Sequence, residues 1–333
     1  MFEKLKNNWT KWHHIFHKAI LTEKELIPNG SNLVVSVSGG QDSMALLTLL
    51  DDIKRQHDWS LNIWHGNHNW HEQSNYFANQ LKKFCLKKNL NFYIDNADEI
   101  DISTEEKARK WRYQKLYELA NKINTENKLN DNISIVTGHT SSDNAETFLM
   151  NLSRGSNLKG LEGIDKKRLL NKKYFLVRPI LLFSRDETAL ICKELNIPYW
   201  VDPSNSDLKL TRNLIRLKVI KNLENIYPGC SSRINNYMQK MRNFNNERTD
   251  LSKLAITSCV CREGIKRNIL NKLGKEARAT ILNTLFLDKC NKQISSKNID
   301  FISNQILIKS NGQETLTDGL LISWNREFIQ INN

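Results

Sequence analysis

Long apolar runs are absent from this 333-residue chain. Its uninterrupted apolar runs are far shorter than the roughly 20 residues that span a bilayer, and charges and histidines interrupt the opening residues. We therefore expect a soluble, cytoplasmic protein with no membrane partner, and the pattern predicts neither a signal peptide nor a transit peptide. Hydrophobic residues still make up 39% of the chain, which predicts about two globular domains.

Cysteine pairs are lacking as well. The six cysteines show no C-x-x-C spacing, so the sequence favours neither a zinc ribbon nor a disulfide framework, and it predicts reduced thiols. His65, His68 and His71 are three residues apart, a spacing that also occurs among metal ligands. Because Gly66 and Asn67 indicate a loop at the end of a strand, we favour a loop over a zinc site.

A Walker phosphate-binding motif is not present either. The only G-x-x-x-x-G, from Gly155 to Gly160, is followed by Leu161 and not by lysine. Transfer of a γ-phosphate is therefore not the chemistry that the sequence favours.

Acidic residues are scarce in the C-terminal third of the chain. Residues 209–333 carry 21 Lys+Arg and 10 Asp+Glu, a net charge of +11, whereas residues 1–208 carry a net charge of +2. This asymmetry predicts a face that binds a polyanion, with nucleic acid as the leading candidate. A solvated, lysine-rich surface is the alternative.

Strand-like and helix-like stretches alternate over the first two thirds of the chain. We expect strands at 33–37, 61–65, 90–94, 133–137, 174–177 and 199–201. We expect helices at 43–56, 71–89, 104–124, 143–153 and 184–195. This order predicts an α/β domain over residues 1–215, with a Rossmann-like parallel sheet covered by helices on both faces. Residues 216–333 are predicted to form a smaller, basic, mainly helical domain that binds RNA and ends in a hairpin, after a hinge near Pro228 and Gly229.

The stretch "VVSVSGGQDSMALL", residues 34–47, joins the first expected strand of the sheet to its helix. A loop in this position presents backbone N–H groups and the positive end of the helix dipole to an anion. Gly39 and Gly40 let the backbone approach a phosphate closely, and Ser38 and Ser43 add hydroxyl donors. The stretch therefore predicts a site for the phosphates of a nucleotide.

At these residues the chain resembles the PP-loop ATP pyrophosphatases, whose SGGxDS signature matches residues 38–43. The resemblance implies an adenine-nucleotide α-hydrolase-like fold and cleavage of ATP between its α and β phosphates. It also implies that Asp42 acts in catalysis by helping to hold Mg²⁺. The implied ATP-binding residues are Ser38, Gly39, Gly40, Gln41, Asp42 and Ser43.

Four further stretches, in family order up to residue 216, resemble the tRNA(Ile)-lysidine synthases. They are "EEKARKWRY" (105–113), "TGHTSSDNAET" (137–147), "SRGSNLKGLEGI" (153–164) and "RPI…R…DPSN…TRNLIR" (178–216). Five ordered matches across more than half of the chain are not expected by chance.

Positions within these matches receive roles from the resemblance. Arg112 would offset the charge that develops at the α-phosphate of ATP. Asp143 and Glu146, three residues apart on a helix, would pair with the amines of free L-lysine or orient its ε-amine for attack. The candidates for contact with substrate or tRNA are Glu105, Arg109, His139, Arg154, Arg178, Arg212 and Arg216. The last four of these either contact tRNA phosphates or bridge the domains.

The implied reaction has two steps. ATP adenylates O2 of the wobble cytidine of an isoleucine tRNA with a CAU anticodon, and the ε-amine of lysine then attacks carbon 2 and expels AMP. The resulting lysidine makes the tRNA read AUA and accept isoleucine. The expected ligands are this tRNA, L-lysine, ATP as cosubstrate and Mg²⁺, whereas the oligomeric state stays open, with a homodimer as one alternative.

Four residues depart from the family pattern. Ser142 stands in place of the first acid of a D-D pair, Asn157 in place of a glycine, and Asn69 and His71 in place of Gly and Arg. Because the first acid is missing, any metal or lysine contact of this helix is assigned to Asp143 and Glu146.

Three other classes of protein share parts of this pattern. Sulfur-inserting PP-loop enzymes commonly depend on paired cysteines, and amidating synthetases need a glutaminase nucleophile; the sequence shows neither. A non-catalytic RNA-binding protein with the same fold has no need of the whole set of loop and acidic residues. Release of AMP from ATP distinguishes an enzyme from such a binding module.

Overall fold

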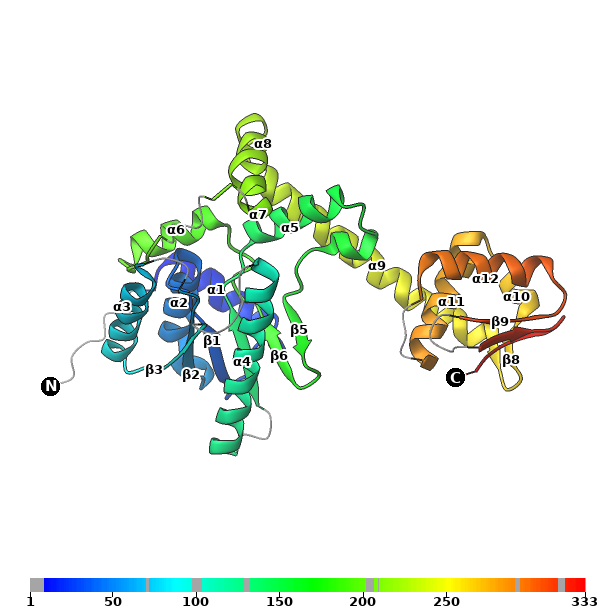
Figure 1. Cartoon of the computed structure of the whole chain (residues 1–333), viewed down its shortest axis with the longest axis horizontal. Helices are drawn as coiled ribbons and strands as arrows, with labels where there is room; N and C mark the ends of the chain where they lie inside the picture. The colour runs from blue at the N-terminus through cyan, green and yellow to red at the C-terminus, as the bar shows by residue number, and fades with distance from the viewer. Residues whose placement is uncertain are drawn as a thin grey trace. The chain divides into compact units, whose positions relative to one another are not determined.

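The computed structural model describes residues 9–69, 72–97, 104–128, 132–201, 207–208, 210–290, 294–316 and 321–332. The chain divides into two compact units, Met1–Gln239 and Lys240–Asn333, each of which has its own core (Figure 1). The division falls within helix α9 (Cys230–Cys259), whereas the predicted boundary lay at residues 215/216.

The first unit extends beyond residue 215 because the segments that follow contact helix α5 (Ser141–Ser153). Three helical pieces follow one another after residue 210, namely α7 (Thr211–Leu214), the π-helical η3 (Ile215–Ile220) and α8 (Lys221–Ile226). Of these, η3 packs against α5. Beyond the break at Pro228 and Gly229, the side-chain amide of Asn235 donates to the carbonyl of Ser141 at 2.9 Å. Both sides of the break therefore stay attached to the first unit.

A six-stranded sheet forms the centre of the first unit, in the order β3-β2-β1-β4-β6-β5. Its strands are β1 (Asn32–Ser36), β2 (Ser60–Asn67), β3 (Asn91–Asn96), β4 (Ile133–Thr137), β5 (Lys167–Leu170) and β6 (Tyr174–Val177). All neighbouring pairs run parallel except β5 and β6, which form an antiparallel pair at one edge. The predicted parallel sheet is confirmed, and the edge strand β5 is an addition to it.

Residues 199–201 are not a strand, contrary to the prediction. The backbone N–H of Trp200 donates to the carbonyl of Gly39 at 3.0 Å instead of pairing in the sheet. Pro198 shortly before it has no N–H to donate to a strand ladder. This segment therefore lies against the glycine-rich loop.

Helices cover both faces of the sheet, as predicted. They are α1 (Lys11–Thr22), α2 (Gln41–His57), α3 (Ser74–Lys87) and α6 (Arg185–Glu194) on one face and α4 (Glu105–Asn127) on the other. Leu33 and Val35 of β1 pack into a core shared with α1, α2, α3 and α6, whereas Val34 enters a second core with α4. Each such aliphatic side chain contributes about 1.5–3 kcal/mol when it is fully buried. Burial on both faces thus fixes the carboxyl end of β1, where the loop begins.

The second unit combines helices with a five-stranded antiparallel sheet in the order β7-β8-β11-β10-β9. Its strands are β7 (Val260–Cys261), β8 (Gly264–Lys266), β9 (Gly312–Thr315), β10 (Leu321–Trp324) and β11 (Phe328–Asn332). Its remaining helices are α10 (Arg267–Asn271), α11 (Lys275–Cys290) and α12 (Ser296–Ile308). The predicted terminal hairpin is the pair β10–β11, while the other three strands were not predicted.

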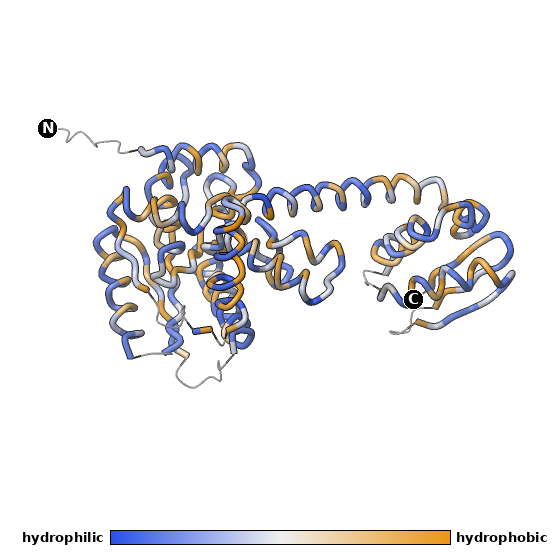
Figure 2. Tube along the Cα trace, turned by 90° about the horizontal axis from the view of Figure 1, so that it is seen from above, coloured by the Kyte–Doolittle hydropathy of each residue, from blue (hydrophilic) through white to orange (hydrophobic). Residues whose placement is uncertain are grey.

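Polar residues interrupt the apolar ones throughout the trace in Figure 2. Among the residues that the structure describes, no helix is both long enough and apolar enough to cross a membrane.

Candidate active site

The loop between β1 and α2 is built to hold an anion. Helix α2 begins at Gln41 with Gly40 as its N-cap. Oγ of Ser38 accepts the N–H of Gly40 at 3.3 Å and lies 3.2 Å from Oγ of Ser43. The first turn of a helix leaves backbone N–H groups without helical acceptors, and its dipole favours negative charge. The turn predicted from the sequence is therefore present.

Gly39 has no room for a side chain. Its φ is +86°, and a Cβ atom placed there would lie 2.9 Å from a ring carbon of Trp200. Gly30 is a matched position, because its φ is +73° but no atom lies within 4 Å of the corresponding Cβ.

We expect Gly39→Ala to weaken binding of an ATP analogue about tenfold, because the loop must shift away from Trp200. Gly30→Ala should lose a similar stability of about 1–2 kcal/mol from its positive φ, yet bind nucleotide normally. Calorimetric titration together with thermal melting of both variants measures this difference. Equal nucleotide affinity in the two variants would contradict a role for the Gly39 contact.

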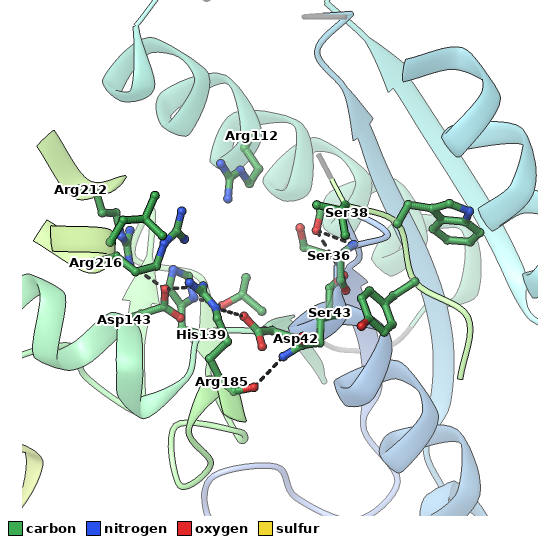
Figure 3. Close-up of a pocket in the computed structure, with 18 residues that line it drawn as sticks. Ser36, Ser38, Asp42, Ser43, Arg112, His139, Asp143, Arg185, Arg212 and Arg216 are labelled. Carbon is green, nitrogen blue, oxygen red and sulfur yellow. Dashed lines mark hydrogen bonds and ion pairs between the residues drawn. The ribbon is translucent and has the colours of Figure 1, made fainter. Parts of the chain in front are cut away.

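A cavity of about 620 Å³ opens beside this loop (Figure 3). It lies where the carboxyl ends of β1 and β4 meet, at the point where the strand order reverses, which is where open α/β sheets bind ligands. Beyond the loop, the arginine, histidine and acidic residues that line it are Arg112, His139, Asp143, Arg185, Arg212 and Arg216. The cavity therefore brings together four of the sequence stretches, from 38 to 216.

Asp143 is held from two sides. Its Oδ2 caps α5 by accepting the N–H of Thr140 at 2.7 Å and the hydroxyl of the same residue at 2.9 Å. Its Oδ1 accepts from Arg212 at 2.9 Å and from Arg185 at 3.5 Å. Burial alone would raise the pKa of Asp143, but Arg212 and Arg185 outweigh it and keep the pKa below its ordinary value. Asp143 is therefore an ionised carboxylate with a fixed orientation.

Glu146 lies one turn further along α5 and is 0% exposed. Its Oε2 accepts from Nε of Arg212 at 2.6 Å. Its Oε1 is buried and has no hydrogen-bond donor within the described part of the chain; Nη1 of Arg185 lies 3.7 Å away. Burial raises the pKa of Glu146 above its ordinary value despite Arg212. Oε1 of Glu146 thus has an ion pair with Arg185 but no hydrogen-bond donor among the residues that the structure describes.

Asp42, in the first turn of α2, faces the same group of charges. Its Oδ2 accepts from Nε of Arg185 at 3.2 Å, and its Oδ1 accepts the hydroxyl of Thr188. Burial raises the pKa of Asp42, and the attraction of Arg185 opposes this rise.

His139 and Arg112 line the cavity with contrasting charge. Burial lowers the pKa of His139 to about 3, with Arg178, Arg212 and Arg109 nearby adding to the effect. The ring is therefore neutral near pH 7, and its Nδ1 lies 2.9 Å from the hydroxyl of Thr137. Arg112 points into the cavity in Figure 3, and no ion pair among the described residues engages it. A guanidinium stays charged at this pH, so Arg112 can face an incoming anion.

The other predicted residues divide into supporting and peripheral ones. Arg109 lies 5.0 Å from the ring centre of Tyr113, and Arg168, which was not predicted, lies 5.1 Å from the same ring centre. Arg178 is 2% exposed and donates to the carbonyl of Asp165. Arg109, Arg168 and Arg178 all interact with Tyr113, and none of the three lines the cavity.

Glu105 and Arg154 do not line the cavity, whereas Arg216 does. Glu105 is half exposed and 3.8 Å from Nη1 of Arg212. Arg154 is exposed at the end of α5. Arg216 lines the cavity and donates to Oδ1 of Asn213 at 2.6 Å. The DPSN stretch, residues 202–205, lies outside the described residues.

Sequence reasoning did not assign a role to Arg185 or Thr188. Arg185 was present only as the isolated arginine within the 178–216 match, and Thr188 follows one turn later on α6. Gln41 ties them to the loop, because its Nε2 donates to the carbonyl of Arg185 at 2.6 Å and to Oγ1 of Thr188 at 2.8 Å. The sequence indicated Arg185 only through its position after Arg178 in the match. That position gave Arg185 no chemical role.

The departures from the family pattern have local structural roles. Oγ of Ser142, where an acid is usual, accepts the N–H of Arg185 at 3.0 Å. Asn157 caps η1 (Leu158–Glu162) with φ −65°, so it does not use the left-handed backbone that a glycine would allow. Asn69 does adopt a left-handed backbone, with φ +51°, and His71 lies outside the described residues.

The histidine-rich stretch does not form a metal site in the part of the chain that the structure describes. Nδ1 of His65 lies 2.8 Å from the carbonyl of Val37, inside the sheet. Within the described residues, no group of three or more His, Cys, Asp or Glu side chains is arranged to hold a metal ion.

Comparison with solved structures agrees with this fold. A U34-tRNA thiolase from Methanococcus maripaludis aligns with a TM-score of 0.55 at 20% identity, covering 68% of this chain and 77% of that one. At this level of identity the likeness shows the fold alone.

Comparison of sequences is more specific. The family model of the PP-loop domain matches residues 11–223. The tRNA(Ile)-lysidine synthase of Prochlorococcus marinus subsp. pastoris is 53% identical over 98% of this chain and 97% of its own length. The chloroplastic tRNA(Ile)-lysidine synthase of Pyropia yezoensis is 38% identical over 63% of each chain. With the cavity and its acidic, basic and loop residues in one place, these matches show that the chain belongs to the tRNA(Ile)-lysidine synthase family.

Proposed function

We propose that this chain uses ATP to join L-lysine to carbon 2 of the wobble cytidine in an isoleucine tRNA with a CAU anticodon. AMP and pyrophosphate are the other products. One observation carries the proposal: the anion-binding loop and Asp143 line a single cavity, and Glu146 is bonded to Arg212, which lines the same cavity. The cytoplasmic location and the oligomeric state expected from the sequence stay predictions.

The first step needs groups that bind phosphate and offset charge. In the proposal, residues 38–43 surround the pyrophosphate portion of ATP, and Arg112 faces the α-phosphate as O2 of the cytidine attacks it. The bond from the α-phosphate to the β-phosphate breaks, and the cytidine becomes adenylated. The guanidinium of Arg112 on the cavity wall, which has no ion pair among the described residues, supports this role.

Magnesium fits this arrangement as an ion shared with the nucleotide. Asp42 supplies one carboxylate beside the phosphate loop, and Mg²⁺ commonly takes one or two carboxylates together with phosphate oxygens and water. When bound, the ion would neutralise phosphate charge. Thr188 holds Oδ1 of Asp42 and Arg185 holds Oδ2, so the carboxylate is already oriented by the chain.

The second step needs a carboxylate that receives an amine. Oε1 of Glu146 lacks a donor among the described residues, and the ammonium of lysine would supply one. Because burial raises its pKa, Glu146 is also a better base than an ordinary glutamate for the proton that the ε-amine loses. His139 is a poor candidate for this proton, since its pKa is about 3. Attack of the amine on carbon 2 then breaks the bond to the AMP oxygen.

Incorporation of radiolabelled lysine tests the function directly. The assay contains MgATP and an unmodified CAU-anticodon isoleucine tRNA transcript, with an elongator methionine tRNA as the control. Label in the isoleucine tRNA alone, with AMP released in equal amount, is the expected result. Release of AMP without label would keep the ATP chemistry and exclude lysine as the nucleophile.

The basic C-terminal third is proposed to hold the tRNA. Charge reversal of the exposed residues Lys253 and Lys297 in the second unit should weaken tRNA binding about tenfold and lower its salt dependence. Charge reversal of Lys110 and Lys122, exposed on α4, is the matched control and should have a smaller effect. Filter binding at several salt concentrations measures both. Equal losses in the two pairs would assign the effect to overall charge.

A further inference from the structure

Arg185 is the cation at the centre of the acidic group. Its guanidinium lies 3.2 Å from Asp42, 3.5 Å from Asp143 and 3.7 Å from Glu146 (Figure 3). The three acids come from two different helices, α2 and α5, and Arg185 is the first residue of a third, α6. Its side chain is 32% exposed, so it borders the open cavity.

The backbone of Arg185 is fixed by uncharged partners, whereas its side chain is held by carboxylates. Its N–H donates to Oγ of Ser142 at 3.0 Å, and its carbonyl accepts from Gln41 at 2.6 Å. A guanidinium in the first turn of a helix is repelled by the positive end of the helix dipole. The carboxylates therefore keep the side chain in this position, and a stronger anion can draw it away.

The guanidinium of Arg185 also lies against the Asp42 carboxylate, which is the proposed ligand of a metal ion. Both oxygens of Asp42 have donors, Arg185 at Oδ2 and Thr188 at Oδ1. Each oxygen keeps a second lone pair, but a divalent ion next to a guanidinium is strongly repelled. Without nucleotide, the charge of Arg185 therefore opposes the binding of a divalent metal ion at Asp42.

We infer that Arg185 keeps divalent metal off Asp42 until nucleotide phosphates fill the loop. The phosphates then provide the anion to which the guanidinium turns, and Asp42 becomes accessible to the ion that arrives with them. This makes Arg185 a positioning residue that couples metal binding to nucleotide binding. The inference rests on the proposed ATP-dependent function and concerns the order in which its ligands bind.

Binding of Mn²⁺ without nucleotide tests the inference, with free Mn²⁺ measured by its electron paramagnetic resonance signal. The wild-type protein should bind Mn²⁺ weakly. Arg185→Gln removes the charge and should gain one site at least about tenfold tighter. The double variant Arg185→Gln with Asp42→Asn should lose that site. Lys193→Gln, which removes an exposed charge from the same helix, is the matched control and should behave as wild type.

Two results would overturn the inference. One is unchanged Mn²⁺ binding in folded Arg185→Gln; the other is a gained site that persists in the double variant. The wild-type protein gives a further reading in case Arg185→Gln does not fold. Millimolar Mg²⁺ alone should leave its melting temperature unchanged, and a rise that Asp42→Asn abolishes would refute the inference. Because none of these measurements uses lysine transfer, they can fail while the proposed function holds, and the lysine assay can fail while they succeed.

Discussion

Asp42→Asn is expected to lower lysidine formation about a thousandfold, whereas tRNA binding should change less than about twofold. The amide keeps an acceptor for the hydroxyl of Thr188 but removes the negative charge that faces Arg185 and, in the proposed function, the magnesium of ATP. The loss should appear in the adenylation step. Release of pyrophosphate in a single turnover, measured beside filter binding of the tRNA, separates the two effects.

Asp186→Asn is the control for this substitution. Asp186 is an exposed acid in the first turn of α6, one residue from Arg185, and it does not line the cavity. It should keep wild-type pyrophosphate release. If Asp42→Asn retained turnover, the role of Asp42 in the phosphate site would be refuted.

Glu146→Gln is expected to separate the two steps of the reaction. The amide can still accept from Arg212, so adenylation should stay within about threefold of wild type. Transfer to lysine should fall about 100- to 1000-fold, because the base for the ε-amine is gone. With ATP labelled at the α-phosphate, the adenylated tRNA should accumulate and be trapped on a gel.

The pH dependence of the second step gives an independent reading. Glu146 must be ionised to take a proton, and burial raises its pKa. Transfer should therefore fall as the pH decreases through a value above that of an ordinary glutamate, and this acid limb should be missing in Glu146→Gln. Glu106→Gln, an exposed acid on α4, is the control and should keep the limb. A parallel loss of both steps in Glu146→Gln would show that Glu146 only supports Arg212.

The sequence predicted the parts of the fold in which local pattern and tertiary structure agree. The strand at 33–37 and the helix after Gly40 are apolar with the correct periods, and burial on both faces of β1 follows from them. The strands β7, β8 and β9 are two to four residues long and carry few apolar side chains. Their pairing depends on distant partners, which no local period reveals.

Among the site residues, only those at positions of a recognised motif were assigned a role from the sequence. Asp42, Asp143 and Glu146 were assigned by matches, and the structure places them around one cation. That cation, Arg185, is 143 residues away from Asp42 in sequence. An ion pair between two helices depends on how the sheet brings the helices together. The residues around Arg185 therefore do not predict its ion pair with Asp42.

The cap at the start of α5 also bears on the entropy of substrate binding. Oδ2 of Asp143 accepts hydrogen bonds from the N–H and the hydroxyl of Thr140, the N-cap residue of α5. These bonds fix the rotamer of the carboxylate before any ligand binds. Ordering a free side chain on binding typically costs about 0.5–1.5 kcal/mol, and here the folding of the helix has already met that cost. Asp143→Asn would keep the size of the side chain but weaken both the helix cap and the contact with Arg212. The stability of α5 and the charge of the site thus depend on the same carboxylate.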